Sequence, residues 1–379
     1  MQTATLLPPI ADEQLWLGEI SDLVARDLAP QVVEIDQQGR YPRQLMRDLG
    51  EQGVMGRSCP PQIGGVGGGL KATLQAMETV SRECMSTGFC LWCQWVCGWY
   101  IQNGDSDFLK TEILPLVLSG QRMGATGMSN PMKHFAGIEN LNLSAKREDG
   151  GFRVSGALPW VSNVASEGFF ACVARVEGGA DGDYLMAIVP GDAPGLTLGE
   201  GGHFVALEGS STYSAIFRDV FIADDWVLAH PCGPYIQRIR PGFILGQTGF
   251  GLGVIAACLE IMQRANKRTG HVNCFLDDRA EHIEADLDAL RTRIYALADE
   301  IGVGQSAAVP SKELVRGCVQ ARLDTSELAL RASQAALLHA GAGGYRAGGA
   351  VDRKLRESYF VAIVTPATKH LKKLLSTLE

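Results

Sequence analysis

Three small residues in the second half of the chain have the spacing of a dinucleotide-binding turn. Gly251, Gly253 and Ala256 fit G-x-G-x-x-A, and Asp277 follows at about the distance at which an acidic side chain binds a ribose. The segment after Asp277 is patterned as helix without alternating strands, so the parallel sheet that such a turn requires is missing. Glycines in a helix also permit close helix packing, and the missing strands favour this second interpretation.

Cysteines form a second group with possible chemistry. Cys90, Cys93 and Cys97 fall at i, i+3 and i+7, with Cys84 nearby. A zinc or redox site needs a second cysteine pair or a histidine at ligand spacing, and this neighbourhood has neither. A buried helix face of small, soft side chains explains the same spacing, and reduced thiols are expected.

Composition narrows the classes of protein. The chain has 379 residues, 46% of them hydrophobic and 20% charged, with a formal net charge of −8. This is ordinary globular composition, and an acidic chain without a long basic run is a poor candidate for binding nucleic acid. The sequence predicts no membrane insertion, because no apolar stretch reaches about 18 residues. No secretory signal pattern is visible, so we expect a cytoplasmic protein.

The hydrophobic pattern changes twice along the chain. Helical spacing dominates the first 120 residues, for example at Trp16, Ile20 and Leu23. Residues 141–225 form short β-rich runs separated by Gly, Asp and Pro, which indicates an antiparallel sheet or barrel. Helical spacing returns at about Pro241. We therefore expect an α+β protein with domains at 1–121 (helical), 122–232 (β) and 233–379 (helical bundle).

Seven segments follow one another in chain order: LAPQVVEIDQQGRYPRQLMRDLGEQGVMG, PPQIGG, GATGMSNP, SGALPWVSN, FRDVFIADDWVL, HAGAGGY and RKLRES. In this order they resemble the acyl-CoA dehydrogenase family of flavoproteins. The first two resemble that family's Phe/Tyr-Pro helix start, Leu-Gly-x-x-Gly turn and Pro-x-x-x-Gly-Gly loop. The later five resemble its Ala-Met-Ser-Glu-Pro strand, Trp-Ile-Thr-Asn segment, Val-x-Val-Pro strand end, Gly-Gly-x-Gly-Tyr loop and Arg-Asp pair.

The resemblance implies an N-terminal helical domain, a middle β-barrel and a C-terminal four-helix-bundle domain, with FAD between barrel and bundle. It also implies a homo-oligomer, usually a homotetramer. Met128 and Ser129 would hydrogen-bond the flavin ring through backbone and hydroxyl groups. Trp160 would stack near the ring, and Ser162 would donate toward its N5 edge. The family usually has Thr at this last position, and Ser keeps the hydroxyl.

Three further groups carry over from the same resemblance. Arg268 matches the arginine that pairs with the FAD pyrophosphate, and a guanidinium suits phosphate geometry. The loop of Gly341, Gly343 and Gly344 would let the backbone approach the FAD of a neighbouring subunit. Arg240 resembles an arginine that contacts CoA in some members. No metal is expected.

The catalytic base departs from the family pattern. Dehydrogenation α,β to a thioester carbonyl needs a base within hydrogen-bond reach of the α proton, and the family uses a glutamate. Aligning Thr368 with a family threonine puts His370 at the glutamate position, and the alternative position in RIRPGFILGQTG carries no acid. His370 is therefore the candidate base. The segment MKHFAG also replaces the family's Gly-Ser-Asp, and in RTGHVNCF the family's aromatic is displaced or missing, so the case for CoA is mixed.

These departures leave three functions open. The first is α,β-dehydrogenation of an acyl-CoA or other acyl thioester, with electrons passed to an electron-transfer flavoprotein. The second is a flavin-dependent monooxygenase of the same fold, supplied by a flavin reductase, which acts on a small or heteroaromatic substrate and in which His134 and His370 assist proton delivery. The third is a non-catalytic relative that binds a ligand.

Overall fold

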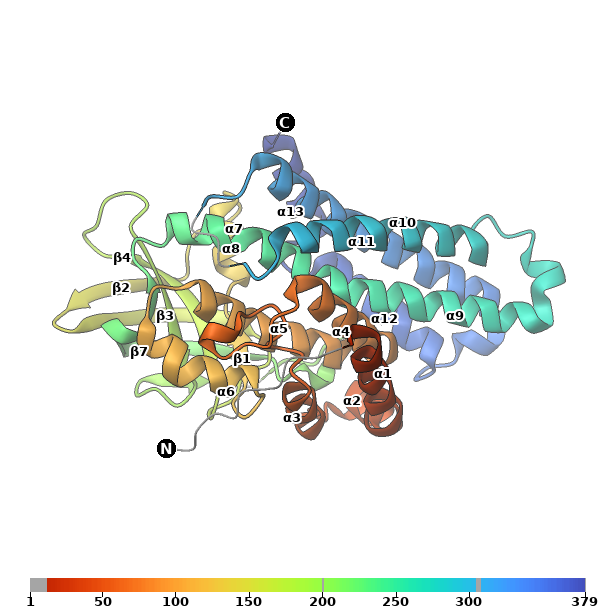
Figure 1. The fold of residues 1–379 in the computed structure, drawn as a ribbon, viewed down its shortest axis with the longest axis horizontal. Helices are drawn as coiled ribbons and strands as arrows, with labels where there is room; N and C mark the ends of the chain where they lie inside the picture. The colour runs from red at the N-terminus through yellow and green to blue at the C-terminus, as the bar shows by residue number, and fades with distance from the viewer. Residues whose placement is uncertain (1–11, 200, 305–307, 379) are drawn as a thin grey trace.

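The first helical region of the protein folds against later helices rather than alone. The computed structural model describes residues 12–199, 201–304 and 308–378 (Figure 1). Asp12 caps the first helix by accepting from the amides of Gln14 and Leu15. The helices before the sheet are α1 (Glu13–Leu23), α2 (Val32–Gln38), α3 (Arg43–Glu51), α4 (Gly69–Glu83), α5 (Met85–Asn103) and α6 (Leu114–Leu118).

The middle region is one eight-stranded sheet. Seven strands follow the order β6-β7-β3-β2-β4-β5-β8, and β1 pairs in parallel with β4. The pair β2/β4 is also parallel, and the remaining pairs are antiparallel. The strands are β1 (Gly124–Thr126), β2 (Leu143–Glu148), β3 (Gly151–Val161), β4 (Phe169–Val176), β5 (Tyr184–Pro190), β6 (Leu196–Leu198), β7 (Tyr213–Ala223) and β8 (Val227–Ala229), with α7 (Ser129–Phe135) between β1 and β2.

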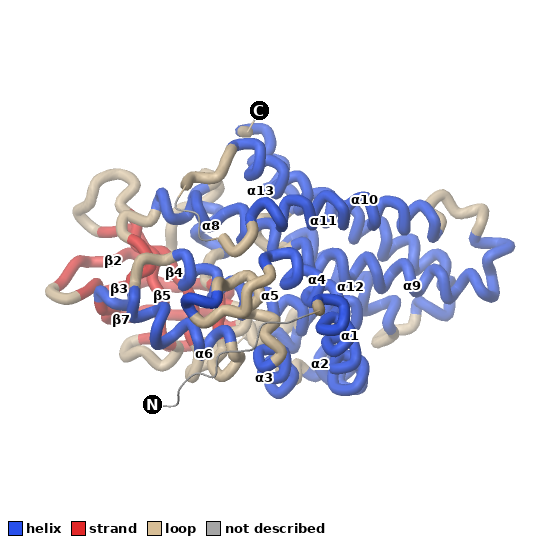
Figure 2. Tube along the Cα trace, viewed as in Figure 1, coloured by secondary structure: helices blue, strands red, loops and turns tan. Residues whose placement is uncertain are grey.

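The last third of the chain is helical and forms a bundle that extends away from the sheet. Figure 2 shows the strands gathered at one end of the molecule and long helices along the rest. Helices α9 to α12 make the bundle. These helices are α8 (Gly233–Gly246), α9 (Thr248–Asn273), α10 (Ala280–Ile301), α11 (Lys312–Ala340), α12 (Ala350–Ile363) and α13 (Thr368–Thr377).

The expected order of helices, sheet and helices is confirmed, and so is the family fold. The helical spacing expected from about Pro241 onward is seen in α10, in which Ile283, Leu287, Leu290 and Ile294 are buried. Helices from both ends of the chain share one hydrophobic core, whereas the sheet has a core of its own. Each hydrophobic face is covered in this way by another layer.

The glycines at 251 and 253 serve helix packing and not a dinucleotide turn. Both lie inside α9, whose neighbours are helices. A Cβ on Gly253 would lie 2.5 Å from the carbonyl oxygen of Glu78, on the backbone of α4, and a Cβ on Gly251 would clash with Thr325 of α11. The two glycines therefore let α9 lie close against two other helices.

We expect Gly253→Ala to lower the free energy of unfolding by about 1–3 kcal/mol, because α4 presents rigid backbone to the added methyl group. Gly270→Ala in the same helix is the matched control. A Cβ there has only the Asn266 Cβ nearby, at 3.7 Å, so this variant should be neutral or more stable. Urea unfolding of both variants compares them, and equal midpoints would refute the packing role.

One helical stretch among the described residues is long and apolar enough to cross a membrane. It spans Gly233–Asn273, and its most apolar 18-residue window is entirely buried in the fold. The sequence prediction that no such stretch exists was therefore wrong. The helices of this stretch lie in the core, where their apolar residues pack against other parts of the fold.

The structure supports the interpretation of these cysteines as a buried helix face of small side chains. Cys84, Cys90, Cys93 and Cys97 are all buried, and burial raises the pKa of each thiol. No cluster of three or more His, Cys, Asp or Glu side chains suited to a metal occurs in the described part of the chain. These thiols fill helix-packing space around α5.

Candidate active site

A cavity of about 900 Å³ lies between the sheet and the helices. Its wall on the sheet side comes from β1, the start of α7 and the end of β3, and its helical wall comes from α5, α8 and α12. The loop 203–212 and the segment leading into α13 complete it. This size is within the range of small-molecule and cofactor sites.

Four residues expected at a flavin line this cavity together. Met128 precedes α7 and is buried, and the Oγ of Ser129 lies 3.1 Å from the Oγ1 of Thr365. Trp160 is 50% exposed, because β3 is irregular between Leu158 and Val161. The exposed indole face and the serine hydroxyls suit a flat ring with polar edges.

Ser162 is held by the turn that follows β3. Its Oγ accepts a hydrogen bond of 2.8 Å from the Oγ1 of Thr212. The next residue, Asn163, has φ +61° and is completely buried, and its amide donates to the Gly124 carbonyl at 2.8 Å. Tyr41 donates to Asn163 Oδ1 at 2.7 Å. The serine hydroxyl is therefore fixed before any ligand arrives.

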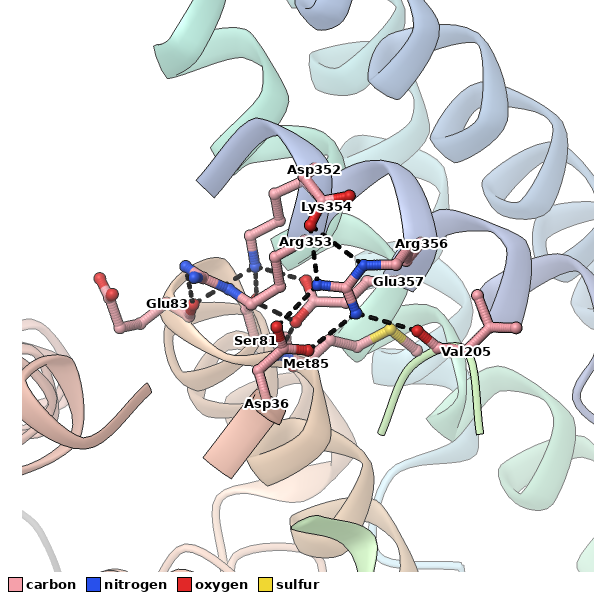
Figure 3. Close-up of polar contacts among 10 residues, drawn as sticks. All are labelled: Asp36, Ser81, Glu83, Met85, Val205, Asp352, Arg353, Lys354, Arg356 and Glu357. Carbon is pink, nitrogen blue, oxygen red and sulfur yellow. Dashed lines mark hydrogen bonds and ion pairs between the residues drawn. The ribbon is translucent and has the colours of Figure 1, made fainter. Parts of the chain in front are cut away.

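Arg356 of α12 secures the loop that forms one wall of the cavity. Its guanidinium forms two hydrogen bonds to Asp36, at 2.9 and 2.7 Å, and donates to the Val205 carbonyl at 2.9 Å (Figure 3). The hydrogen bonds that Arg356 donates to Asp36, together with the nearby Asp352, raise the pKa of Arg356. Phe204 in the same loop meets Trp160 edge to face, with ring centroids 5.6 Å apart.

The wall contains no carboxylate among the described residues. Its ionisable side chains are Lys133, Lys369, His203, Arg356 and Tyr359. Arg356 is neutralised by Asp36 and Asp352, which lie outside the wall. The cavity is thus apolar with a cationic edge, and its described wall offers no glutamate or aspartate for proton abstraction.

His370 does not form part of the cavity wall, contrary to the sequence prediction. It is 3% exposed on α13, and neither ring nitrogen has a hydrogen-bond partner. Burial lowers the pKa of His370 to about 4, and the charges of Arg240, Lys373 and Lys133 add to this effect. The imidazole is therefore neutral near pH 7, and it lies outside the cavity in which the predicted base would act.

The low pKa of His370 predicts a pH-dependent stability. Unfolded imidazole binds a proton below about pH 6.5, whereas the folded ring does not until about pH 4. The free energy of unfolding should therefore fall as the pH drops from 6.5 toward 4, and His370→Leu should reduce this loss. Urea midpoints at pH 7 and 4.5 measure it, with the fully exposed His203→Gln as the control. Identical pH dependence in wild type and His370→Leu would contradict the prediction.

Two other candidates lie outside the wall. Arg240 of α8 is half-buried near His370, its Nε has no partner, and burial lowers its pKa. His134 is bonded at Nε2 to the Tyr184 hydroxyl, 3.0 Å away, and at Nδ1 to the Glu139 carbonyl. Neither side chain reaches the cavity in this structure.

Arg268 and the glycine loop lie at the end of the bundle that points away from the sheet (Figure 1). Arg268 is exposed near the end of α9. His339, just before the loop, bonds Asn266 of α9 at 3.0 Å, so the arginine and the loop lie at the same end. Side chains at Gly341 and Gly343 would meet nothing within 4 Å. These residues do not join the cavity of their own chain.

Sequence reasoning missed several residues of the wall. No periodicity or motif spacing in the sequence marks Thr365, Thr212, Arg356 or the loop around Phe204. Arg356 stands inside the segment RKLRES, which carries part of the family resemblance, so that segment was the available signal. The other three positions are revealed only by the fold.

Comparisons with known proteins agree with the fold. A family model for the N-terminal domain of acyl-CoA dehydrogenases matches residues 11–121. The chain is 25% identical to the probable acyl-CoA dehydrogenase YngJ of Bacillus subtilis, over 93% of each chain. It is 30% identical to benzylmalonyl-CoA dehydrogenase of Aromatoleum aromaticum, over 66% of this chain and 67% of that protein.

A solved structure extends the similarity to the whole chain. Butyryl-CoA dehydrogenase from Megasphaera elsdenii superposes with a TM-score of 0.85, covering 97% of this chain and 98% of that one at 19% identity. The helices, the sheet and the bundle therefore correspond from end to end. The chain belongs to the acyl-CoA dehydrogenase family.

Proposed function

We propose that the protein is an FAD-dependent oxidoreductase that acts on a small molecule in the cavity between sheet and helices. The observation that carries this proposal is the convergence of Met128, Ser129, Trp160 and Ser162 on one cavity of about 900 Å³. The family is one of FAD-binding flavoproteins. Bound FAD would supply two-electron redox chemistry at this place.

The residues of the wall suit this cofactor. Trp160 offers an exposed aromatic face, and two serine hydroxyls held by Thr212 and Thr365 can bond polar ring edges. Lys133 and Lys369 add positive charge at the edge. The helical wall excludes water and offers apolar surface to a substrate.

Two reactions fit such a site, and the wall distinguishes them. Dehydrogenation of an acyl thioester, with an electron-transfer flavoprotein as acceptor, is suggested by the names of the curated relatives. It needs a base at the α proton, and the described wall has no carboxylate. An oxygen-dependent monooxygenation, for which a flavin reductase supplies the reduced flavin, needs no such base. The carboxylate-free wall therefore favours the second reaction.

An anaerobic titration of the purified protein with a panel of acyl-CoAs tests both reactions. Bleaching of the flavin absorbance by one class of thioester would establish the dehydrogenase and reveal a base outside the described wall. If the flavin stays oxidised, oxygen uptake with a flavin reductase and candidate substrates would support the monooxygenase. A bound flavin inert in both assays would favour a non-catalytic relative, and a protein that binds no FAD would overturn the proposal.

We also propose a homo-oligomer in which the far end of one bundle completes the cavity of another copy. Arg268 and the loop Gly341–Tyr345 lie there, and two neighbouring aromatics, Phe275 and Tyr345, are 85% and 83% exposed. Such exposed rings at the end of a helical bundle suit burial against a second copy. A guanidinium supplied in this way would pair with the pyrophosphate of FAD.

Gel filtration of Arg268→Ala tests this arrangement. The variant should elute with the size of the wild type but retain less FAD. Arg264→Ala, one turn earlier on the same exposed face of α9, should retain FAD fully. An Arg268→Ala protein that stays fully loaded, or a wild type that is a monomer, would contradict the shared site.

A further inference from the structure

The helical wall of the cavity is made of aromatic rings. Phe89 and Trp92 come from α5, Phe243 from α8 and Phe360 from α12, and all four line the cavity. Three helices from distant parts of the chain thus contribute the same kind of side chain to one place. We call these four residues the aromatic wall.

The four rings have a defined mutual geometry. Phe89 and Trp92 are nearly parallel, with an interplanar angle of 14° and centroids 5.7 Å apart. Phe360 stands at 70° to Phe89 at 4.8 Å, and Phe243 stands at 66° to Trp92 at 5.4 Å. The base of the wall is therefore a stacked pair of rings, flanked by one steep ring beside each of them.

The base of the aromatic wall is supported from outside the cavity. Phe250 of α9 meets both Phe89 and Trp92 at 85°, with centroids 5.9 and 6.2 Å away, and does not line the cavity. Every residue of α5 from Met85 to Gln102 is buried. The two rings of the base are thus held in place before a ligand binds, which reduces the entropy lost on binding.

This geometry favours a flat aromatic ligand over a straight alkyl chain. Aromatic pairs prefer offset-stacked or edge-to-face contacts, and a wall with one stacked pair and two steep rings offers both kinds. A ring has few rotatable bonds to freeze, whereas a straight chain must give up many conformations. Both ligands would bury apolar surface, so the difference in their affinities measures the ring contacts together with the smaller entropy loss of the ring.

We propose that the substrate of this enzyme carries an aromatic ring that binds against Phe89, Trp92, Phe243 and Phe360. This rests on the proposed function in one respect, namely that the cavity is the substrate site of the flavin enzyme. The aromatic wall determines the specificity for the substrate. The polar groups near Ser129 and Ser162 lie at the sheet side of the same cavity.

Calorimetric titration with two matched probes tests the proposal. 3-Phenylpropanoyl-CoA and nonanoyl-CoA have the same number of acyl carbons, and the two free acids form a second pair for a site that takes no CoA. We expect the aromatic member of at least one pair to bind with a Kd about tenfold lower, which corresponds to about 1.4 kcal/mol. Equal affinities, tighter binding of the alkyl member, or no binding of either aromatic probe would overturn it.

Variants show whether the ring contacts cause the preference. Phe89→Leu and Phe360→Leu keep apolar volume but remove a ring, so each should reduce the tenfold preference while FAD stays bound. Phe360 is only half-buried, which keeps this variant informative if Phe89→Leu does not fold. Phe221→Leu, on the exposed face of β7, is the control and should leave the preference unchanged. A preference that survives both cavity variants would overturn the proposal.

The outcome is separable from the proposed function. FAD content is measured on the same samples, and the heat of probe binding does not require turnover. A flavin-loaded protein without aromatic preference would refute the aromatic substrate and leave the oxidoreductase intact. A protein without flavin that still prefers the aromatic probe would refute the cofactor and leave the ligand class intact.

Discussion

Glu357→Gln should lower the free energy of unfolding by about 3–5 kcal/mol. Glu357 and Lys354 of α12 form an ion pair at 2.8 Å, with side chains 1% and 3% exposed. Glu357 also accepts from the Met85 amide at the start of α5, at 3.1 Å, and Lys354 donates to the Ser81 carbonyl at 3.0 Å (Figure 3). Glutamine keeps the size but leaves the buried ammonium without its counter-charge.

Urea unfolding near pH 7 measures this loss. Glu327→Gln is the matched control, because its ion pair with Lys372 is about half exposed and should be worth less than about 1 kcal/mol. The double variant Glu357→Gln with Lys354→Met should recover part of the stability, since it removes the unpaired charge. A loss below 1 kcal/mol for Glu357→Gln alone would show that the pair does not hold α12 against α5.

Trp160→Ala should raise the Kd for FAD about thirtyfold with little change in the stability of the protein without cofactor. The indole is half exposed at the cavity, so its contacts with the ring of FAD are worth roughly 2 kcal/mol, while folding buries little of it. Trp160→Phe keeps a ring and should lose much less affinity. Fluorescence titration with FAD gives the Kd values.

The control for this experiment is another half-buried aromatic on the same sheet. Tyr213 of β7 is 37% exposed and does not line the cavity, so Tyr213→Ala should leave the Kd unchanged. An unchanged Kd in Trp160→Ala would show that the flavin ring does not bind against this indole. Equal losses in both variants would indicate damage to the sheet and not to the binding site.

Elements with a regular period were predictable from the sequence. The stripe that includes Ile283, Leu287 and Leu290 gives α10, because a helix repeats every 3.6 residues whatever it packs against. The family resemblance likewise predicted Met128, Ser129, Trp160 and Ser162, and the structure brings them to one cavity.

Positions that depend on distant contacts were not predictable. The role of Gly253 is set by the backbone of α4, about 170 residues earlier in the chain. His370 was assigned by a local alignment, and its burial beside Arg240 appears only in the fold. The loop at Phe204 has no period and is positioned by Arg356, so nothing in its own sequence reveals the wall that it forms.

The shared core of the helices has a consequence during synthesis on the ribosome. Helix α4 ends at Glu83, whereas α9, which packs on it, begins at Thr248. At 5–20 residues per second, about 10–30 s pass before α9 is made. For this time, buried residues such as Leu74, Met77 and Trp92 lack their contacts with α9. The nascent chain therefore exposes a long apolar surface that chaperones must shield, while the sheet, with its separate core, can already close.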